Sequence, residues 1–390
     1  MHWSVTKDPC HSKYLYVCQD TQLAIYRINE RAETPRRDEE TEFSRDEDHD
    51  ENEDHDENKG KWIEVKNSIE PTGATVGEND GRRHTKAIRR SVIALDVCNS
   101  EDWLITCSFD GKGILWTRPT TGSTPFSWRY KAEFDGQGAE MKAVAIYKPS
   151  QGLVQPQGGD DLPLVAACCR DKTLWVFTYD ADQNEFTCQS LLSKHTQDIK
   201  YVTFHPYLPL LVSASYDDKV ILYKYDPYED TWQDFKQMRD HSSTVWMVTF
   251  SLDGTRMYTT GADGCLCVYH SAQLATQRKK ITHYGLGLLN KRLITTIPDD
   301  WRLVDEFNVA ELQPTLPLNM NVNLYTVALR ARKVLLASSL GSIYVKEDDG
   351  SWSMVEAAHD RCEVNCAIWL DAHSFVSVGD DDVVRLWTSH

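Results

Sequence analysis

Cysteine residues are the first candidates for chemistry in this 390-residue chain. The 11 cysteines include an adjacent pair and two closely spaced pairs: Cys168-Cys169, Cys265-x-Cys267 and Cys362-x3-Cys366. None of these pairs has the C-x2-C spacing typical of zinc sites and iron–sulfur clusters. Most of them fall in apolar, strand-like runs, where a thiol packs as a small hydrophobic side chain. The spacing therefore predicts no metal site and no bound cofactor.

Other catalytic patterns give a similar result. His49 and His55 lie in an acidic run and could bind a divalent cation weakly, but a solvated acidic segment is the favoured interpretation. The chain has no glycine-rich phosphate loop, no HExxH zinc motif and no nucleophile elbow. We therefore expect a protein that is not an enzyme.

One polar set near the C-terminus has a spacing with a structural meaning. An imidazole, a hydroxyl, a carboxylate and an indole could form a chain of hydrogen bonds that pairs polar groups inside a sheet. These groups belong to His359, Ser377, Asp381 and Trp387. A similar order recurs in "HTQDIKYVTFHPYLPLLVSASYDDKVILY" at 195–223 and in "HSSTVWMVTFSLDGTRMYTTGADGCLCVY" at 241–269. Such recurrence is typical of a repeat protein.

The repeat extends along the whole chain. An aspartate is followed six residues later by an aromatic residue at Asp20/Tyr26, Asp110/Trp116, Asp171/Phe177, Asp217/Tyr223, Asp263/Tyr269 and Asp381/Trp387. A degenerate seventh unit, "KVLLASSLGSIYVK" at 333–346, has Leu340 in place of the aspartate and Lys346 in place of the aromatic residue. Short strands at a period of about 40–45 residues predict an all-β fold, a seven-bladed WD40 β-propeller.

Insertions interrupt the repeat. We expect a single propeller over residues 1–390, with a disordered acidic insert in the first blade at 30–60 and loop insertions at about 68–83, 149–163 and 271–298. Residues 38–57 alone contain 13 acidic residues and one arginine, out of a net charge of −17 for the chain.

Composition excludes several classes of partner. A chain with no basic face is not expected to bind nucleic acid by counterion release. There is no apolar run long enough to span a membrane and no signal-peptide pattern, so we expect a cytoplasmic and possibly also nuclear protein with reduced cysteines.

Several strings resemble one particular family. "SASYDD" at 213–218, "CCRDKTLWVF" at 168–177, "HSSTVW" at 241–246 and "VNCAIW" at 364–369 are similar to the WD40 propeller of the cytosolic iron–sulfur protein assembly (CIA) machinery. The resemblance covers nearly the whole repeat region. It implies a scaffold without its own cluster, in the complex that delivers Fe–S clusters to apoproteins.

The resemblance extends to a ring of channel residues. One residue near the start of each innermost strand is expected to face the central channel, and the order of residue types matches the family at Trp3, Arg89, Lys142, Lys200, Trp246, Tyr325 and Asn365. Phe109, Arg170 and Tyr216 each precede the aspartate of an acidic turn on the same face, although Arg170 could instead pair with Asp171. Arginine and aromatic residues often dominate binding energy, so we expect these ten residues to form a partner-binding surface.

The resemblance also implies partners. These are a MIP18-family protein, the large HEAT-repeat CIA adaptor, the iron-only-hydrogenase-like cluster carrier and client Fe–S apoproteins. An alternative is a WD40 substrate receptor or scaffold in an unrelated complex, such as one for ubiquitin ligation, chromatin or RNA processing.

One departure concerns closure of the ring. The family begins with a strand that pairs with the last blade, whereas this chain begins at "HWSV" in an innermost strand and stops at "WTSH". We therefore expect that either the chain is truncated at its start or the last blade has an open edge.

Overall fold

The computed structural model describes most of the propeller. It describes residues 4–8, 10–29, 62–66, 68–77, 84, 86, 88–96, 101–119, 121–136, 138–147, 164–226, 228–283, 297–313 and 320–389. Trp3, the acidic insert at 30–60 and the predicted loop at 149–163 therefore lie outside the described residues.

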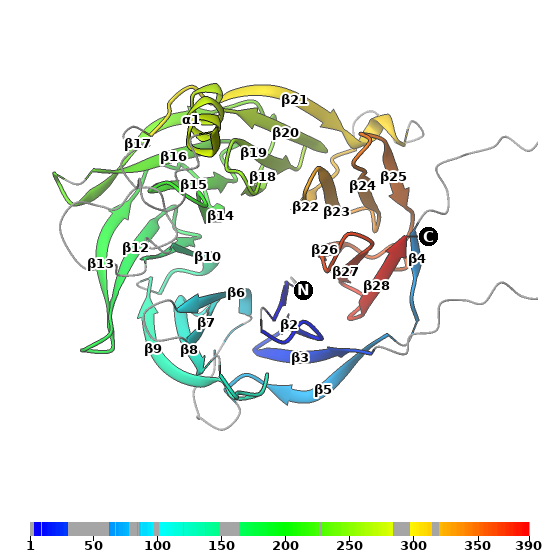
Figure 1. The fold of residues 1–390 in the computed structure, drawn as a ribbon, viewed down its shortest axis with the longest axis horizontal. Coiled ribbons are helices and arrows are strands. Elements are labelled where there is room, and N and C mark those ends of the chain that lie inside the picture. Colours follow the sequence, from blue (N-terminus) through cyan, green and yellow to red (C-terminus); the bar gives the residue numbers. More distant parts are fainter. Residues whose placement is uncertain are drawn as a thin grey trace, which may run out of the picture.

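The described strands form seven four-stranded antiparallel sheets, arranged as blades around a central axis (Figure 1). The predicted seven-bladed WD40 propeller is confirmed. The first blade contains β1 (Val5–Lys7), β2 (Tyr14–Gln19), β3 (Gln22–Ile28) and β5 (Ile69–Thr75). The second contains β6 (Ile88–Asp96), β7 (Glu101–Ser108), β8 (Lys112–Pro119) and β9 (Arg129–Asp135), and the third β10 (Met141–Tyr147), β11 (Leu164–Cys169), β12 (Leu174–Asp180) and β13 (Glu185–Leu192).

The remaining blades continue in chain order. The fourth contains β14 (Ile199–Phe204), β15 (Leu210–Ser215), β16 (Val220–Asp226) and β17 (Thr231–Met238), and the fifth β18 (Val245–Phe250), β19 (Arg256–Gly261), β20 (Cys265–His270) and β21 (Arg302–Asn308). The sixth contains β22 (Leu324–Arg330), β23 (Lys333–Ser338), β24 (Ile343–Lys346) and β25 (Trp352–Val355), and the seventh β26 (Val364–Trp369), β27 (Ser374–Gly379), β28 (Val384–Ser389) and β4 (Trp62–Glu64). The degenerate unit at 333–346 thus supplies β23 and β24 of the sixth blade.

The seventh blade corrects the expectation of an open edge. β4 pairs antiparallel with β28, with Trp62 opposite Ser389 and Glu64 opposite Trp387. The indole of Trp62 packs against Phe375 and Trp369, with ring-centroid distances of 4.8 and 5.7 Å. The chain therefore leaves the first blade after β3, supplies the outer strand of the seventh, and returns as β5. This exchange across the ring is a nonlocal pairing, which a search for local repeats does not detect.

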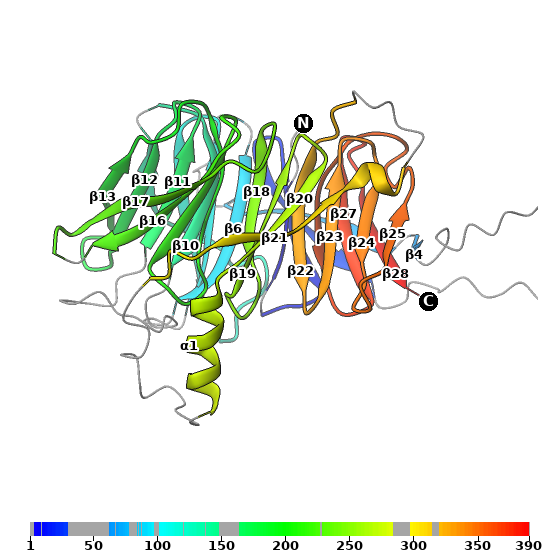
Figure 2. The ribbon, with the colours of Figure 1, turned by 90° about the horizontal axis from the view of Figure 1, so that it is seen from above.

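Two predicted insertions also contain regular structure. Residues 69–75 form β5, so the segment at 68–83 begins with the fourth strand of the first blade. Within 271–298, residues Ala272–His283 form the helix α1, which projects from one face of the ring (Figure 2). Ser271 caps this helix, because its Oγ accepts a hydrogen bond from the amide of Leu274, and the Asp300 carboxylate accepts one from the amide of Gln273.

Neighbouring blades pack through apolar faces, and one charged cluster lies between the first two. Arg118 is fully buried, and its guanidinium donates to the carboxylates of Asp8 and Asp102 and to the hydroxyl of Tyr16. The Trp128 indole donates to the same hydroxyl. Both charges of each pair are removed from water, so removal of one partner would leave an uncompensated buried charge.

Candidate binding site at the channel mouth

The recurrent polar networks position the loops on one face of the ring. In the seventh blade the His359 ring lies 2.7 Å from both Asp381 Oδ1 and Ser377 Oγ, and the Trp387 indole donates to the same Ser377 oxygen at 2.8 Å. Burial alone would raise the pKa of Asp381, but hydrogen bonds from His359 and Arg385 lower it. The network therefore ties the loop before the innermost strand to the acidic turn of its own blade.

Similar contacts occur in three other blades. His84 lies 2.8 Å from Thr106 Oγ1, His195 lies 2.7 Å from Ser213 Oγ, and His241 lies 2.8 Å from Thr259 Oγ1. His195 and His241 also contact the acidic turns of their blades, at Asp217 and Asp263. These buried contacts make this face of the propeller a rigid frame for exposed side chains.

A bulge in each of six innermost strands explains why the ring residues face the channel. The register of pairing shifts between Ile88 and Arg90 in β6, and in the same way in β10, β14, β18, β22 and β26. A bulge re-aims the side chain of the extra residue. The residues skipped by these shifts are Arg89, Lys142, Lys200, Trp246, Tyr325 and Asn365.

These six residues line one cavity, which we call the channel pocket. Its other lining residues are Ser4, Arg90, Tyr201, Thr326 and Cys366. Four of the lining side chains are cationic, and none of the described lining residues is acidic. The structure thus brings together every described member of the predicted ring, while Trp3 lies outside the described residues.

Arg89 is the least compensated of these cations. Its Nε and Nη1 atoms are buried and have no hydrogen-bond partner among the described residues. Burial lowers the pKa of Arg89 to about 10, so the guanidinium still carries its charge at neutral pH. It lies 5.3 Å from the ring centroid of Phe109. A buried guanidinium with free N–H groups favours an incoming anion.

Lys142 connects the ring to Arg170 through one carboxylate. Lys142 Nζ lies 2.9 Å from Glu140, and Arg170 Nη1 lies 3.2 Å from the other oxygen of the same group. Arg170 therefore pairs with Glu140, not with the neighbouring Asp171. The hydrogen bond from Lys142 lowers the pKa of Glu140. Because the Arg170 side chain is 62% exposed, it remains accessible to a ligand.

Lys200 lies between two aromatic rings. Its Nζ is 5.0 Å from the ring centroid of Tyr216 and 5.3 Å from that of Trp246. Burial lowers the pKa of Lys200, and the Asp198 carboxylate at 3.5 Å opposes this effect. Tyr216 is 55% exposed, so an aromatic surface continues from the channel to the rim.

The other side of the pocket is aromatic and polar. Trp246 and Tyr325 pack edge to face with centroids 5.1 Å apart. The hydroxyl of Tyr325 donates to Glu363 at 2.8 Å, and the amide of Asn365 donates to Asp380 at 2.8 Å. The pocket therefore has a cationic half and an aromatic half.

Sequence reasoning missed the residues that modulate these charges. Glu140 and Asp198 each lie two residues before a ring lysine, a spacing that could have identified them. Arg90 was also missed: it donates to the Tyr201 hydroxyl, and its guanidinium lies 4.5 Å from that ring.

Metal binding finds no support in the part of the chain that the structure describes. No group of three or more His, Cys, Asp or Glu side chains there could hold an ion. Cys168, Cys265, Cys267 and Cys366 are buried in strands. In addition, no described helix is long and apolar enough to cross a bilayer.

Comparison with known proteins places the chain in a family. Residues 186–224 and 232–270 match the family model "WD domain, G-beta repeat". A protein from Scheffersomyces stipitis, named probable cytosolic iron-sulfur protein assembly protein 1, is 32% identical over 303 residues, covering 73% of this chain and 77% of that protein. The chain belongs to the cytosolic iron-sulfur protein assembly protein 1 family.

Other members of this family give similar values. The Lodderomyces elongisporus protein of the same name is 33% identical over 279 residues, and the Candida albicans protein is 31% identical over 278 residues. Each match covers 67% of this chain. The match spans 63% of the length of the Lodderomyces protein.

Proposed function

We propose that this chain is a non-catalytic scaffold of cytosolic iron–sulfur protein assembly, which links late-acting assembly factors to apoproteins that receive Fe–S clusters. Family membership supports the process, and the propeller supports a binding role. The proposed partners are a MIP18-family protein, the HEAT-repeat adaptor, the hydrogenase-like cluster carrier and client apoproteins. Co-purification of a MIP18-family protein and Fe–S clients with the tagged chain would support this assignment, whereas recovery of only ubiquitin-ligase or chromatin subunits would contradict it.

The observation that carries the proposal is the two-sided channel pocket. Arg89, Lys142 and Lys200 supply charge on one side, and Trp246 and Tyr325 supply aromatic surface on the other. A peptide with an acidic group and an aromatic side chain fits this arrangement, because cations bind its carboxylate and aromatic faces bind its ring. We propose that a client or adaptor peptide binds here, with Arg170 and Tyr216 at the rim.

Charge variants on the rim test this site with opposite expected signs. Arg170→Glu removes a charge-assisted contact worth about 1.5–3 kcal/mol, so the affinity for an acidic–aromatic peptide should fall more than tenfold. Glu140→Gln frees Arg170 and Lys142 from their internal partner, so the same peptide should bind more tightly. The measurement is fluorescence anisotropy with a labelled peptide.

The control is Arg129→Glu, an exposed charge reversal on β9 of the second blade. It should leave peptide affinity unchanged. If Arg170→Glu and Lys200→Glu both fold, as judged by circular dichroism, and both bind the peptide normally, the channel mouth is not the site.

A further inference from the structure

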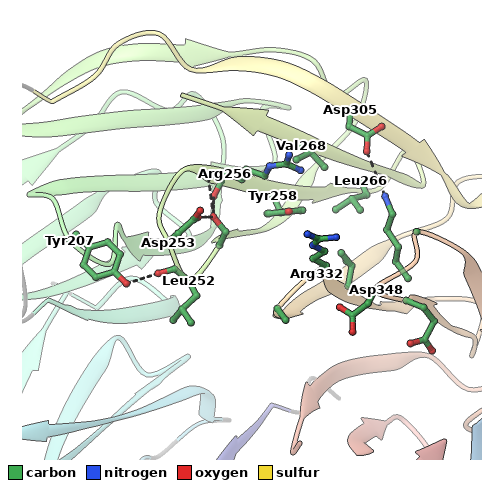
Figure 3. A pocket seen from close by; sticks show the side chains of 16 residues that line it. Tyr207, Leu252, Asp253, Arg256, Tyr258, Leu266, Val268, Asp305, Arg332 and Asp348 are labelled. Carbon is green, nitrogen blue, oxygen red and sulfur yellow. Dashed lines mark hydrogen bonds and ion pairs between the residues drawn. The ribbon is translucent and has the colours of Figure 1, made fainter. Parts of the chain in front are cut away.

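A cavity of about 790 Å³ lies between the fifth and sixth blades (Figure 3). Its charges nearly balance, because four carboxylates line it against three cations: Asp253, Asp305, Glu347 and Asp348 against Arg256, Arg332 and Lys346. Its apolar lining residues Leu266, Val268 and Val334 are already buried in the core between the two blades. This cavity therefore selects neither a charged nor an apolar ligand.

The aromatic half of the channel pocket, in contrast, is supported by one asparagine. Asn323 lies just before β22, and its side chain bonds to Trp246 of the fifth blade and to Tyr325 of the sixth. Its Oδ1 atom accepts a hydrogen bond from the Trp246 indole at 3.1 Å, and its Nδ2 atom donates to the Tyr325 hydroxyl at 3.3 Å. The orientation of this amide is fixed, because an indole N–H can only donate and therefore requires the oxygen. The Tyr325 hydroxyl then donates to Glu363 of the seventh blade at 2.8 Å.

The backbone of Asn323 is fixed as well. Its amide donates to Ser339 Oγ at 3.0 Å, and its carbonyl accepts a hydrogen bond from the Ser339 amide at 2.9 Å. This pair joins the start of β22 to the β23–β24 turn, where the degenerate repeat has Leu340 in place of the aspartate. The Asn323 side chain is therefore held from a fixed backbone position.

A ligand meets ring surfaces in this half of the pocket. The indole N–H of Trp246 and the hydroxyl of Tyr325 are bonded within the protein, and the two rings meet edge to face with centroids 5.1 Å apart. The channel pocket has a volume of about 60 Å³, well below the ~150 Å³ of a cavity that holds benzene. An aromatic side chain of a ligand must therefore lie across the mouth of the pocket, against these ring surfaces.

We propose that Asn323 is a positioning residue that makes the channel pocket select an aromatic side chain over an aliphatic one. It holds Trp246 and Tyr325 in place before the ligand arrives, so that binding does not have to order them. The energy of an aromatic contact beyond its buried area depends on the relative orientation of the rings. This inference rests on the peptide binding proposed above and adds the residue that sets its side-chain preference.

The test compares two labelled peptides that have a single phenylalanine or a single leucine, flanked on each side by Asp-Glu. Fluorescence anisotropy with the full chain should show that the phenylalanine peptide binds roughly two- to tenfold more tightly, the increment that a well-oriented aromatic pair supplies. In Asn323→Ala the ratio of the two affinities should fall close to one, with little change for the leucine peptide. Asn323→Leu fills the same space without the hydrogen bonds and should lose the preference in the same way.

A matched control is Asn321→Ala, which removes an exposed asparagine two residues earlier in the same segment. It should keep the preference of the parent chain. An unchanged ratio in folded Asn323→Ala and Asn323→Leu would overturn the inference, as would an equal loss of affinity for both peptides, which indicates a structural role. Equal binding of the two peptides by the parent chain would also overturn it while leaving the proposed peptide site intact. If the parent chain binds neither peptide, the proposed peptide site is itself wrong, and the role of Asn323 is wrong with it.

Discussion

Closure of the ring by β4 makes a sharp prediction about Trp62. The indole is 6% exposed and packs on Phe375 and Trp369, although β4 contributes only three residues of pairing to β28. A buried tryptophan removes about 150–250 Å² from water, which at about 25 cal/mol per Å² corresponds to about 4–6 kcal/mol as an upper bound. Substitution of a buried phenylalanine or tryptophan by alanine typically lowers the free energy of unfolding by about 3–5 kcal/mol.

Truncation of Trp62 should cost less stability than full exposure of the indole implies, because β4 can detach while the other blades stay folded. We therefore expect Trp62→Ala to lower the free energy of unfolding by about 3 kcal/mol, measured by urea denaturation followed by circular dichroism. The released β28 edge should also promote concentration-dependent self-association, detectable by sedimentation.

A matched control is Tyr228→Ala, which truncates an aromatic residue that is 96% exposed. Its effect should stay within about 0.5 kcal/mol of the parent chain. If Trp62→Ala is equally mild and remains monomeric, β4 does not close the ring, and the reasoning from its burial fails.

Three further predictions concern buried polar groups. Ser377→Ala leaves the Trp387 indole and the His359 ring without their shared partner, so the free energy of unfolding should fall by about 1–3 kcal/mol in urea titrations, and an unchanged value would contradict this. Burial lowers the pKa of the His359 imidazole below its usual 6.5 in the folded protein. As the pH falls below 6.5, the imidazole therefore takes up a proton in the unfolded chain before it does so in the folded one. The free energy of unfolding decreases as a result. In His359→Gln the free energy of unfolding should fall less steeply with decreasing pH than in the parent chain, the two slopes differing by at most about 1.4 kcal/mol per pH unit. Equal slopes in urea titrations of the two proteins at several pH values would contradict this. Arg118→Met leaves two buried carboxylates without their partner and should lower the free energy of unfolding by about 3–5 kcal/mol. Part of this loss should be recovered when Asp8 and Asp102 are also changed to Asn. If nothing is recovered, unpaired buried charge is not the cause.

The number and order of the blades could be predicted from the sequence, because each repeat is specified by residues close together in the chain. The spacing of Asp217 and Tyr223 depends on one turn and one strand, and the same is true of Asp381 and Trp387. Even the degenerate unit at 333–346 retained enough strand pattern to be counted. The order of residue types around the channel could be predicted for the same reason, since each ring residue lies near the start of a recognisable strand.

Other features depend on contacts between distant segments. The cap of α1 combines Ser271 with Asp300, which lies 29 residues further along the chain. The position of Glu140 between Lys142 and Arg170 depends on how β10 and β11 pair. A search for motifs does not detect such features, because none of them is contained in a single repeat.

The sequence by itself determined the repeat count, the polar networks and the six ring residues that the structure describes, because a period of about 40–45 residues and short-range turn chemistry are properties of local segments. Tertiary structure alone decided how the ring closes and which charges are compensated. Those outcomes depend on pairing between segments such as β4 and β28, more than 300 residues apart in the chain. Their free energy comes from burial and strand pairing that exist only after the blades have assembled.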